Sequence, residues 1–259
     1  MDLLTSFYRY LEGMEATTEA LKERAHRVRY EVYCMERGFE DPAAFPDGLE
    51  RDAYDVRSLQ ALVQHRTTGY PAGVVRLVQP DPGNIDAPFP VELQCGEVLD
   101  RRVIERFGVD RAHLAEVSRF AVARGFKRRP GEADTVAGVS GELEYDAEQQ
   151  LETARRIFPH ISLGLIAMLF VMSQREGITH WYAVMEPSLS RLLTRFGINF
   201  TPIGPIVDYH GRRQPMMARP DQLLETIRHK RPDFRALIDS LSGVPVTARQ
   251  AQSPRNAIG

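Results

Sequence analysis

Apolar residues recur with two different periods along this chain, and the order of the two periods restricts the fold. Between residues 17 and 37 they are spaced by three or four positions, which predicts an amphipathic helix that stops at Gly38. The apolar positions of this helix are Leu21, Ala25, Val28, Val32 and Met35. From residue 59 onward the spacing changes to two, and Leu59, Ala61 and Val63 predict a strand.

Residues 38–55, which separate these two elements, are dense in Pro, Gly and Asp and are expected to form a loop. The same criteria predict the remaining elements. In chain order they are a strand at 72–78, a proline-rich loop at 80–96, a short helix at 97–107, a strand at 114–123, a helix at 163–176, a strand at 179–185, a helix at 187–196, closing strands at 198–209 and 214–219, and a helix from Pro220 with Leu223, Leu224 and Ile227 inward. Helices and strands alternate, with hairpins at both ends, so we expect a mixed α/β (α+β) domain with one central sheet.

The length of 259 residues suits one domain, which we place at residues 1–243. A charged, Gly-rich excursion at about 125–150 interrupts it, and residues 244–259 are expected to form a loose tail. The charges nearly balance, with 33 Lys and Arg against 35 Asp and Glu, so the composition favours neither nucleic acid nor an anionic membrane as a partner.

Several observations favour a cytoplasmic protein without a membrane span. The two cysteines, Cys34 and Cys95, are far apart and form no disulfide framework, which fits a reducing compartment. The first residues lack the pattern of a signal peptide. The longest apolar stretch, 161–172, has only about half the roughly 20 residues that a membrane-spanning helix needs.

Motifs for several common chemistries are absent from the sequence. It contains no GxSxG, GxxxxGK, HExxH or paired CxxC motif, and no histidine is followed five positions later by an aspartate. Serine hydrolases, P-loop enzymes, common zinc sites and HxxxxD acyltransferases therefore have no support. We expect neither a metal site nor a tightly bound cofactor.

A set of charged and aromatic residues remains whose order and spacing are informative. They are Arg29, Tyr33, Phe39, Asp52, Asp55, Arg76, Glu116, Ser118, Arg119 and Phe120. This pattern resembles that of the acyl-homoserine-lactone autoinducer synthases and the related N-acyl amino acid synthases of the GNAT superfamily. The resemblance covers roughly residues 20–215 and includes the run LSRLLTRFG. Within this group the segment RYEVYCMERGFE is most similar to the acyltransferases associated with exosortase (PEP-CTERM) protein-sorting systems.

The resemblance implies a GNAT-type fold, with a mixed, mostly antiparallel sheet flanked by helices. It also implies an N-acyltransferase that moves a fatty acyl group from acyl carrier protein or acyl-coenzyme A to the amine of a small acceptor such as an amino acid. The autoinducer synthases carry Trp where this chain has Phe39, near S-adenosylmethionine, which favours a different amine. Some synthases carry Thr at the position of Ala183 to recognise a 3-oxo group, which favours an unsubstituted acyl chain.

Acyl transfer to nitrogen needs a group that takes a proton and donors that stabilise the oxyanion. Glu116 is the candidate base, acting directly or through one water, and Ser118 is the second candidate catalytic residue. The alternative is that Glu116 only pairs with Arg119. The expected substrate-binding residues are Arg29, Tyr33, Phe39, Asp52, Asp55, Arg76, Arg119, Phe120, Leu169 and Ala183.

The charged members of this set are expected to form a network that pins residues 38–55 over the cleft. Asp52 and Asp55 either contact the acceptor amine or belong to a solvated acidic loop, because Asp is common in turns. The acyl pocket is expected between the helix residues Leu165, Ile166, Leu169 and Phe170 and the strand 182–184. The same apolar residues also suit an ordinary core.

The residues after Phe120 bear on the identity of the acyl donor. The run AVARGFKRRPGE lacks the Gly-rich RxxGxG spacing that holds the coenzyme A pyrophosphate in acetyltransferases of this fold. Four basic residues, Arg124, Lys127, Arg128 and Arg129, are candidates for docking an acidic acyl carrier protein, and a solvated face is the alternative.

Three other functions stay open: an S-adenosylmethionine-dependent acyl-homoserine-lactone synthase, an acetyl-coenzyme A-dependent N-acetyltransferase, and a non-catalytic module that binds acyl carriers or lipids.

Overall fold

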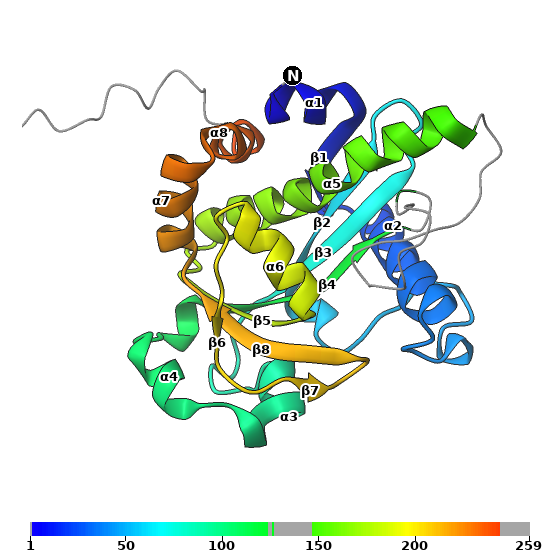
Figure 1. The fold of residues 1–259 in the computed structure, drawn as a ribbon. Helices are drawn as coiled ribbons and strands as arrows, with labels where there is room; N and C mark the ends of the chain where they lie inside the picture. The colour runs from blue at the N-terminus through cyan, green and yellow to red at the C-terminus, as the bar shows by residue number, and fades with distance from the viewer. Residues whose placement is uncertain (1, 124–125, 127–146, 244–259) are drawn as a thin grey trace, which may run out of the picture.

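The computed structural model describes residues 2–123, 126 and 147–243, and the side chains of residues 147–158 lie outside this description. In the described part the chain forms an eight-stranded sheet in the order β1-β2-β3-β4-β5-β8-β6, with β7 paired to β8 (Figure 1). The strands are β1 Leu11–Glu15, β2 Ser58–His65, β3 Pro71–Val78, β4 Leu114–Val122, β5 His180–Met185, β6 Thr201–Pro202, β7 Val207–Asp208 and β8 Arg212–Ala218.

All pairings in this sheet are antiparallel except the one between β4 and β5. A parallel pair needs a long crossover, and here the crossover includes the helix α5, Ala147–Arg175. This mixed, mostly antiparallel sheet with flanking helices confirms the predicted fold class.

The helices lie on both faces of the sheet. Helix α5 packs along β1 to β4, together with α1 and α8 on the same side, and α2 packs on the opposite face against β2, β3 and β4 (Figure 1). The α-helices besides α5 are α1 Leu3–Tyr10, α2 Glu19–Arg29, α3 Pro90–Cys95, α4 Arg101–Arg106, α6 Pro187–Arg195, α7 Pro220–Lys230 and α8 Pro232–Leu241. None of the helices in the described ranges is both long and apolar enough to cross a membrane.

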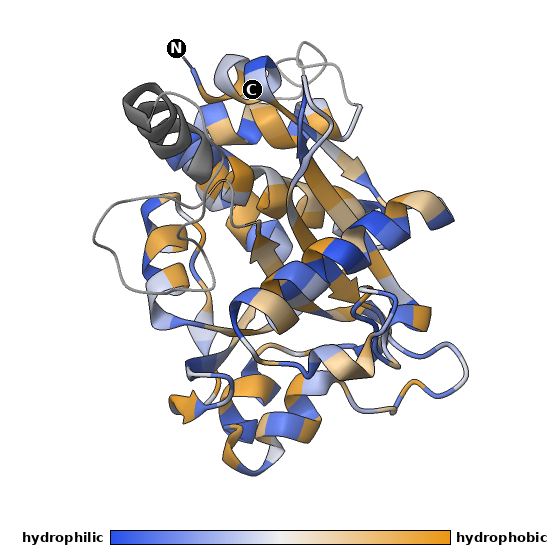
Figure 2. Cartoon of the chain, turned by 90° about the vertical axis from the view of Figure 1, so that its right-hand side faces the viewer, coloured by the Kyte–Doolittle hydropathy of each residue, from blue (hydrophilic) through white to orange (hydrophobic). Residues whose placement is uncertain are grey.

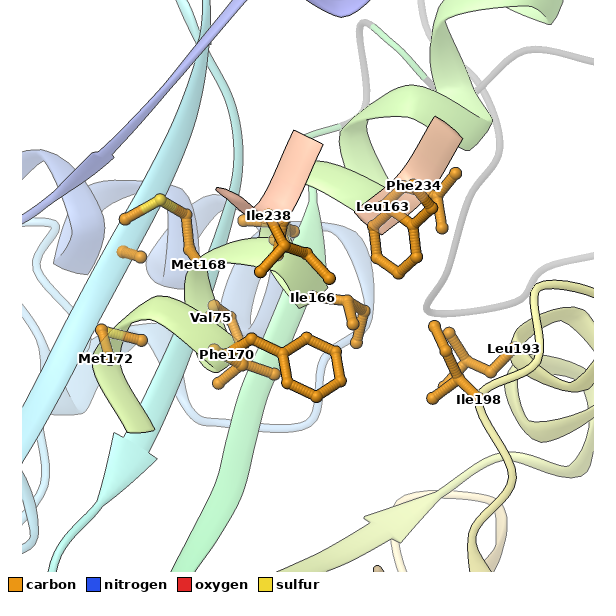
Figure 3. Close-up of a cluster of buried hydrophobic side chains, with 14 of the residues drawn as sticks. Val75, Leu163, Ile166, Met168, Phe170, Met172, Leu193, Ile198, Phe234 and Ile238 are labelled. Atoms are coloured by element: carbon orange, nitrogen blue, oxygen red, sulfur yellow. The ribbon is translucent and has the colours of Figure 1, made fainter. Parts of the chain in front are cut away.

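Successive side chains of a strand point to opposite faces of the sheet, so the strands contribute to two separate hydrophobic cores. On β2, Ala61 and Val63 belong to the large cluster beneath α5, whereas Leu62 packs with Val28 and Val32 on the α2 side. Figure 3 shows the large cluster, in which side chains from α5, α6 and α8 meet. Figure 2 shows the same division by hydropathy: apolar residues gather where α5 meets the strands, and the outer helices alternate apolar and polar residues.

The helix predicted at 17–37 is confirmed, and its ends have local causes. The Thr18 hydroxyl accepts a hydrogen bond from the Leu21 amide at 3.3 Å and so caps the first turn. After Arg29 the helix continues as a π-helix over Tyr30–Glu36. It stops at Gly38, whose φ of 61° suits glycine.

Several predicted elements need correction. The proline-rich loop at 80–96 contains the helix α3, which begins at Pro90, because proline fits the first helical turn. The helix predicted at 97–107 is a 3₁₀ turn, Gly96–Val98, followed by α4. The strand predicted at 198–209 is reduced to the two short strands β6 and β7.

The largest corrections concern helices. The helix predicted at 163–176 begins much earlier, at Ala147, because Pro159 is tolerated inside it, so the excursion predicted at 125–150 ends before residue 150. The helices α1 and α8 and the strand β1 were not predicted. The rest of the excursion and the tail at 244–259 lie outside the described residues.

Helix α5 approaches α1 closely at Gly164. A Cβ atom there would lie 2.5 Å from the ring of Phe7, which is fully buried. Overpacking costs about 1–3 kcal/mol, and alanine regains only about 1 kcal/mol over glycine inside a helix. We therefore expect Gly164→Ala to lower the melting temperature. Gly96→Ala, where no atom lies within 4 Å, is the control and should not lower it; equal melting temperatures would contradict the close packing.

Candidate active site

A β-bulge in β4 shapes the centre of the site. Arg76 on β3 pairs with Ser118, but Val74, two residues away, pairs with Ala121, so β4 holds one extra residue. Arg119 within this bulge has a φ of 49°, which non-glycine residues rarely adopt. The bulge directs the Arg119 side chain to the sheet face that α2 covers, where it meets carboxylates of the 38–55 segment.

Polar side chains cross this face of the sheet in one row. Gln60, Arg76 and Ser118 occupy paired positions on β2, β3 and β4. The Arg76 Nε donates to the Ser118 Oγ at 2.9 Å, and Arg29, which reaches the row from α2, donates to the Gln60 side-chain oxygen at 3.2 Å. Arg29 and Arg76 are 0% and 1% exposed, so both cations need anionic partners inside the protein.

Asp52 and Asp55 supply part of this negative charge. Arg29 binds Asp55 through two hydrogen bonds of 2.6 and 3.0 Å. Arg76 donates to Asp52 at 2.6 Å and to Asp55 at 2.9 Å. Burial by itself raises the pKa of Asp55, but the hydrogen bonds and charge of Arg29, followed by the charge of Arg76, lower it. The network predicted to pin residues 38–55 is therefore present.

Glu50 completes the network and was missed by the sequence analysis. It is 1% exposed, binds Arg29, and accepts a hydrogen bond from the Arg119 Nη2 at 2.9 Å. Burial would raise its pKa, but Arg119 and Arg29 lower it to about 2. Three arginines, two of them buried, facing only two predicted aspartates were a signal that a third carboxylate was needed.

The predicted aromatic residues lie beside this network. The Tyr33 hydroxyl donates to the Phe120 carbonyl at 3.3 Å, and the Arg119 guanidinium lies 5.3 Å from the Tyr33 ring centroid. Phe39 packs beside Tyr33 and against His210, with 5.0 Å between the centroids of Phe39 and His210. Aromatic residues that are far apart in sequence, and that the family resemblance had grouped, therefore lie close together in the fold.

Glu116 lies on the same sheet face but in an apolar surrounding. It is 3% exposed, and its carboxylate accepts a hydrogen bond from the Val91 amide of α3 at 2.8 Å. The buried cluster around it includes Phe89 and Tyr182. Burial raises the pKa of Glu116 to about 8, against the smaller lowering effects of the Val91 hydrogen bond and of the nearby arginines.

The alternative in which Glu116 serves only as the ion-pair partner of Arg119 does not match the contacts. Arg119 binds Glu50 and Asp52, at 2.9 and 3.2 Å, and lies 3.5 Å from the carboxylate of Glu40. Within the part of the chain that the structure describes, Glu116 forms no salt bridge, and its carboxyl group can take up a proton near neutral pH.

A pocket opens where the parallel strands separate. The pairing of β4 with β5 runs from Leu114 and His180 to Val117 and Ala183, and ends there. The pocket beyond it is lined by Tyr33, Val117, Ser118, Arg119, Phe120, Ile166, Ala183, Val184, Met185, Glu186, Leu189, Leu193, Phe200 and Arg213. One end of this lining carries polar groups of β4, and the side chains from α5 and α6 are apolar.

Two groups of predicted site residues are not among those that line the pocket in the described structure. Leu169, like Leu165 and Phe170, is buried in the large core and does not line the pocket, whereas Ile166 on the same helix does. The candidate docking residues, Arg124, Lys127, Arg128 and Arg129, lie outside the described residues.

Residues 28–136 match the family model of an acetyltransferase (GNAT) domain. No curated protein sequence matches the chain.

Three solved structures share the fold. TofI, in a ternary complex with an inhibitor and MTA, is 20% identical with a TM-score of 0.57, over 88% of this chain and 98% of that one. BjaI, a coenzyme A-dependent acyl-homoserine lactone synthase solved with SAM and isopentyl-CoA, is 18% identical with a TM-score of 0.52, over 91% and 90%. FeeM, an N-acyl amino acid synthase from uncultured soil microbes, is 12% identical with a TM-score of 0.50, over 83% and 93%.

The matched part of the chain is therefore similar to an acetyltransferase (GNAT) domain. The fold of the chain is the one found in acyl-homoserine lactone synthases and in an N-acyl amino acid synthase.

Removal of the Glu50 charge tests the network. Glu50→Gln leaves Arg29 and Arg119 short of an anion, so we expect a loss of about 3 to 5 kcal/mol in unfolding free energy at pH 7. The pKa of Glu50 is lowered on folding, so this difference should be complete above about pH 4.5 and shrink as the pH falls toward about 2.

Urea unfolding at several pH values measures this loss. Asp47→Asn, in an exposed pair with Arg51, is the control and should leave the unfolding midpoint unchanged. A Glu50→Gln variant as stable as the wild type would show that the buried cations do not depend on Glu50.

Proposed function

We propose that this protein is an N-acyltransferase that moves a fatty acyl group from a carrier thioester to the amine of a small acceptor, such as an amino acid. The observation that carries the proposal is the pocket at the separation of β4 and β5. It joins an apolar lining, suited to an acyl chain, to Ser118 and Arg119 at one end. The buried Glu116 lies two residues before Ser118 on the same strand.

In this proposal the thioester carbonyl lies near Ser118 and the acyl chain extends between α5 and α6. The amine nitrogen attacks the carbonyl carbon, the new C–N bond forms, and the C–S bond breaks to release the carrier thiol. The proton lost by the nitrogen passes to Glu116, which then returns it to the departing thiolate sulfur to give the thiol. Because Glu116 is almost fully buried and does not line the pocket, we assign this transfer to one bridging water.

Ser118 is the proposed donor to the developing oxyanion. Its Oγ accepts a hydrogen bond from the Arg76 Nε at 2.9 Å, so its own proton is directed elsewhere and is available to the carbonyl oxygen. Arg76 is fixed in turn by Asp52 and Asp55, which gives the aspartates a positioning role.

The acceptor and the donor are proposed by analogy with the structural neighbours. FeeM is an N-acyl amino acid synthase, and Phe39 in place of the autoinducer-synthase Trp favours an acceptor other than S-adenosylmethionine. BjaI uses a coenzyme A thioester, whereas Arg124, Lys127, Arg128 and Arg129 favour acyl carrier protein. The link to exosortase systems stays a prediction.

The first test is the replacement of the proposed base. Glu116→Gln should keep the fold and lower the rate of acyl transfer on the order of 100-fold or more. The wild-type rate should rise with pH through about 8, since the base must lose its proton first, and this rise should be absent from the variant. Mass spectrometry of extracts from a bacterial host expressing each form detects the N-acyl product and its acceptor.

Glu97→Gln is the matched control, because Glu97 is an exposed carboxylate near α3. Equal product from Glu116→Gln and wild type would contradict the assignment of the base, and would favour the binding-module alternative if neither forms product from purified thioesters and amines.

The second test concerns the acyl pocket. Leu189→Trp fills the pocket with a larger side chain, so we expect the preferred acyl chain to shorten by several carbons, as measured by the chain lengths of the products. Leu192→Trp on the same helix is the control, since Leu192 does not line the pocket. An unchanged chain-length profile in Leu189→Trp would place the acyl chain elsewhere.

A further inference from the structure

We propose that Arg57 and Arg111 are positioning residues of the reaction, because together they hold the segment 79–95 over Glu116 through the ring of Phe89. This inference rests on the proposed role of Glu116. Neither arginine lines the pocket between β4 and β5, and neither bonds to Glu116. Both act through the segment that covers it.

The segment 79–95 has few backbone bonds to the sheet. Its first residue, Gln79, donates to the Arg57 carbonyl at 2.8 Å, and the next described bonds lie within the segment itself. Helix α3 at its end has six residues and is too short to be stable alone. Side-chain contacts must therefore hold it in place.

Arg111 fastens the segment at three points. Its guanidinium donates to both oxygens of Glu92, at 2.7 and 3.0 Å, and to the carbonyls of Ile85 and Ala87, at 3.1 and 3.0 Å. Glu92 also accepts from the Phe89 amide at 2.9 Å, so it caps the first turn of α3. One arginine thus fixes both the loop and the helix.

Arg57 fastens the same segment, residues 79–95, which we call the cover, at its first residue and near the start of α3. It donates to the Gln79 carbonyl at 2.7 Å and to the Pro88 carbonyl at 2.9 Å. Its guanidinium lies 5.3 Å from the ring centroid of Phe89, and Arg111 lies at the same distance from that ring. Phe89 is fully buried and contacts both cations, an arrangement that favours one position of the ring.

The cover acts on Glu116 in two ways. The Val91 amide orients the carboxylate by a hydrogen bond of 2.8 Å. Phe89, Val91 and Cys95 are buried in one apolar cluster beside the carboxyl group, which keeps bulk solvent, but not the single bridging water, away from it. A looser cover would admit water and favour the ionised form.

The other groups that act electrostatically on Glu116 come from several elements. Arg76 on β3 and Arg119 on β4 lower its pKa, and Glu92 on α3 raises it. Tyr54, Cys95, Tyr182 and Tyr209 are the uncharged titratable groups that interact with it. Loss of a cation nearby, or loss of the partner of Glu92, would by itself raise the pKa of Glu116.

The direction in which the pH–rate profile shifts distinguishes a positioning role from a simple charge effect. Arg111→Gln leaves Glu92 unpaired and Arg57→Gln removes a cation, so a purely electrostatic effect shifts the pH–rate profile upward. A loosened cover has two opposing effects, since hydration of the carboxyl group lowers its pKa and loss of the Val91 hydrogen bond raises it. Burial is the larger influence on this pKa, so the net shift is downward. We expect each variant to move the rise in rate at least one pH unit below that of the wild type, with a lower maximal rate.

Hydrogen exchange provides a readout that needs no substrate. We expect the Val91 amide to exchange at least 10-fold faster in Arg111→Gln and in Arg57→Gln, while the Val75 amide in the centre of the sheet exchanges as in the wild type. Arg231→Gln is the matched control, because Arg231 also pairs with a carboxylate, that of Asp233, and lies over a ring, that of Phe196.

Each outcome decides the inference. A profile that is unchanged or shifted upward in both arginine variants, with unchanged Val91 exchange, overturns it. If one variant does not fold, the other gives the answer. If the rise in rate persists in Glu116→Gln, the proposed base is wrong, and exchange of the Val91 amide then tests only whether the two arginines hold the cover. Faster exchange of both Val91 and Val75 would indicate a general loss of stability and would contradict a local role.

Discussion

The structure depends on the compensation of buried arginine charges on one face of its sheet. Arg29 and Arg76 are almost fully buried, and an unpaired cation in such a place would cost several kcal/mol. The carboxylates that compensate them come from the turn-rich segment 38–55, which has no regular place in the sheet. The same ion pairs therefore neutralise the face and fix the segment over it. The bulge in β4 adds Arg119 to this arrangement.

Two kinds of acidic group lie on this face, and their surroundings separate their roles. Glu50 and Asp55 contact arginines directly, so they stay ionised and hold the structure together. Glu116, one row of the sheet away, is paired with Val78 and Tyr182 on the neighbouring strands and accepts a hydrogen bond from Val91 instead. Burial without a close cation favours its protonated form. The charge network makes this possible, because it engages Arg76 and Arg119 with other carboxylates.

The sheet also connects the core to the pocket. Beneath α5 the apolar side chains of the strands and helices pack closely (Figure 3). Where β4 and β5 separate after Val117 and Ala183, the same apolar lining continues as an open pocket. In the proposed function an apolar chain lies along this lining without a separate domain, and Ile166, rather than Leu169, contributes to the lining from α5.

The sequence by itself determined the fold class, most of the strands and the members of the charge network other than Glu50. Periodicity reports which side of an element is buried, and it is local, so it identified α2 and the central strands but missed α3 and α8, which are short and depend on packing. Only the tertiary structure decided which acids are buried. Glu50 and Asp47 lie three residues apart in the same acidic loop, yet Glu50 is buried against Arg29 and Arg119 and Asp47 is half exposed. The cover over Glu116 could not be predicted from the sequence either, because Arg57 and Arg111 are brought to Phe89 only by folding.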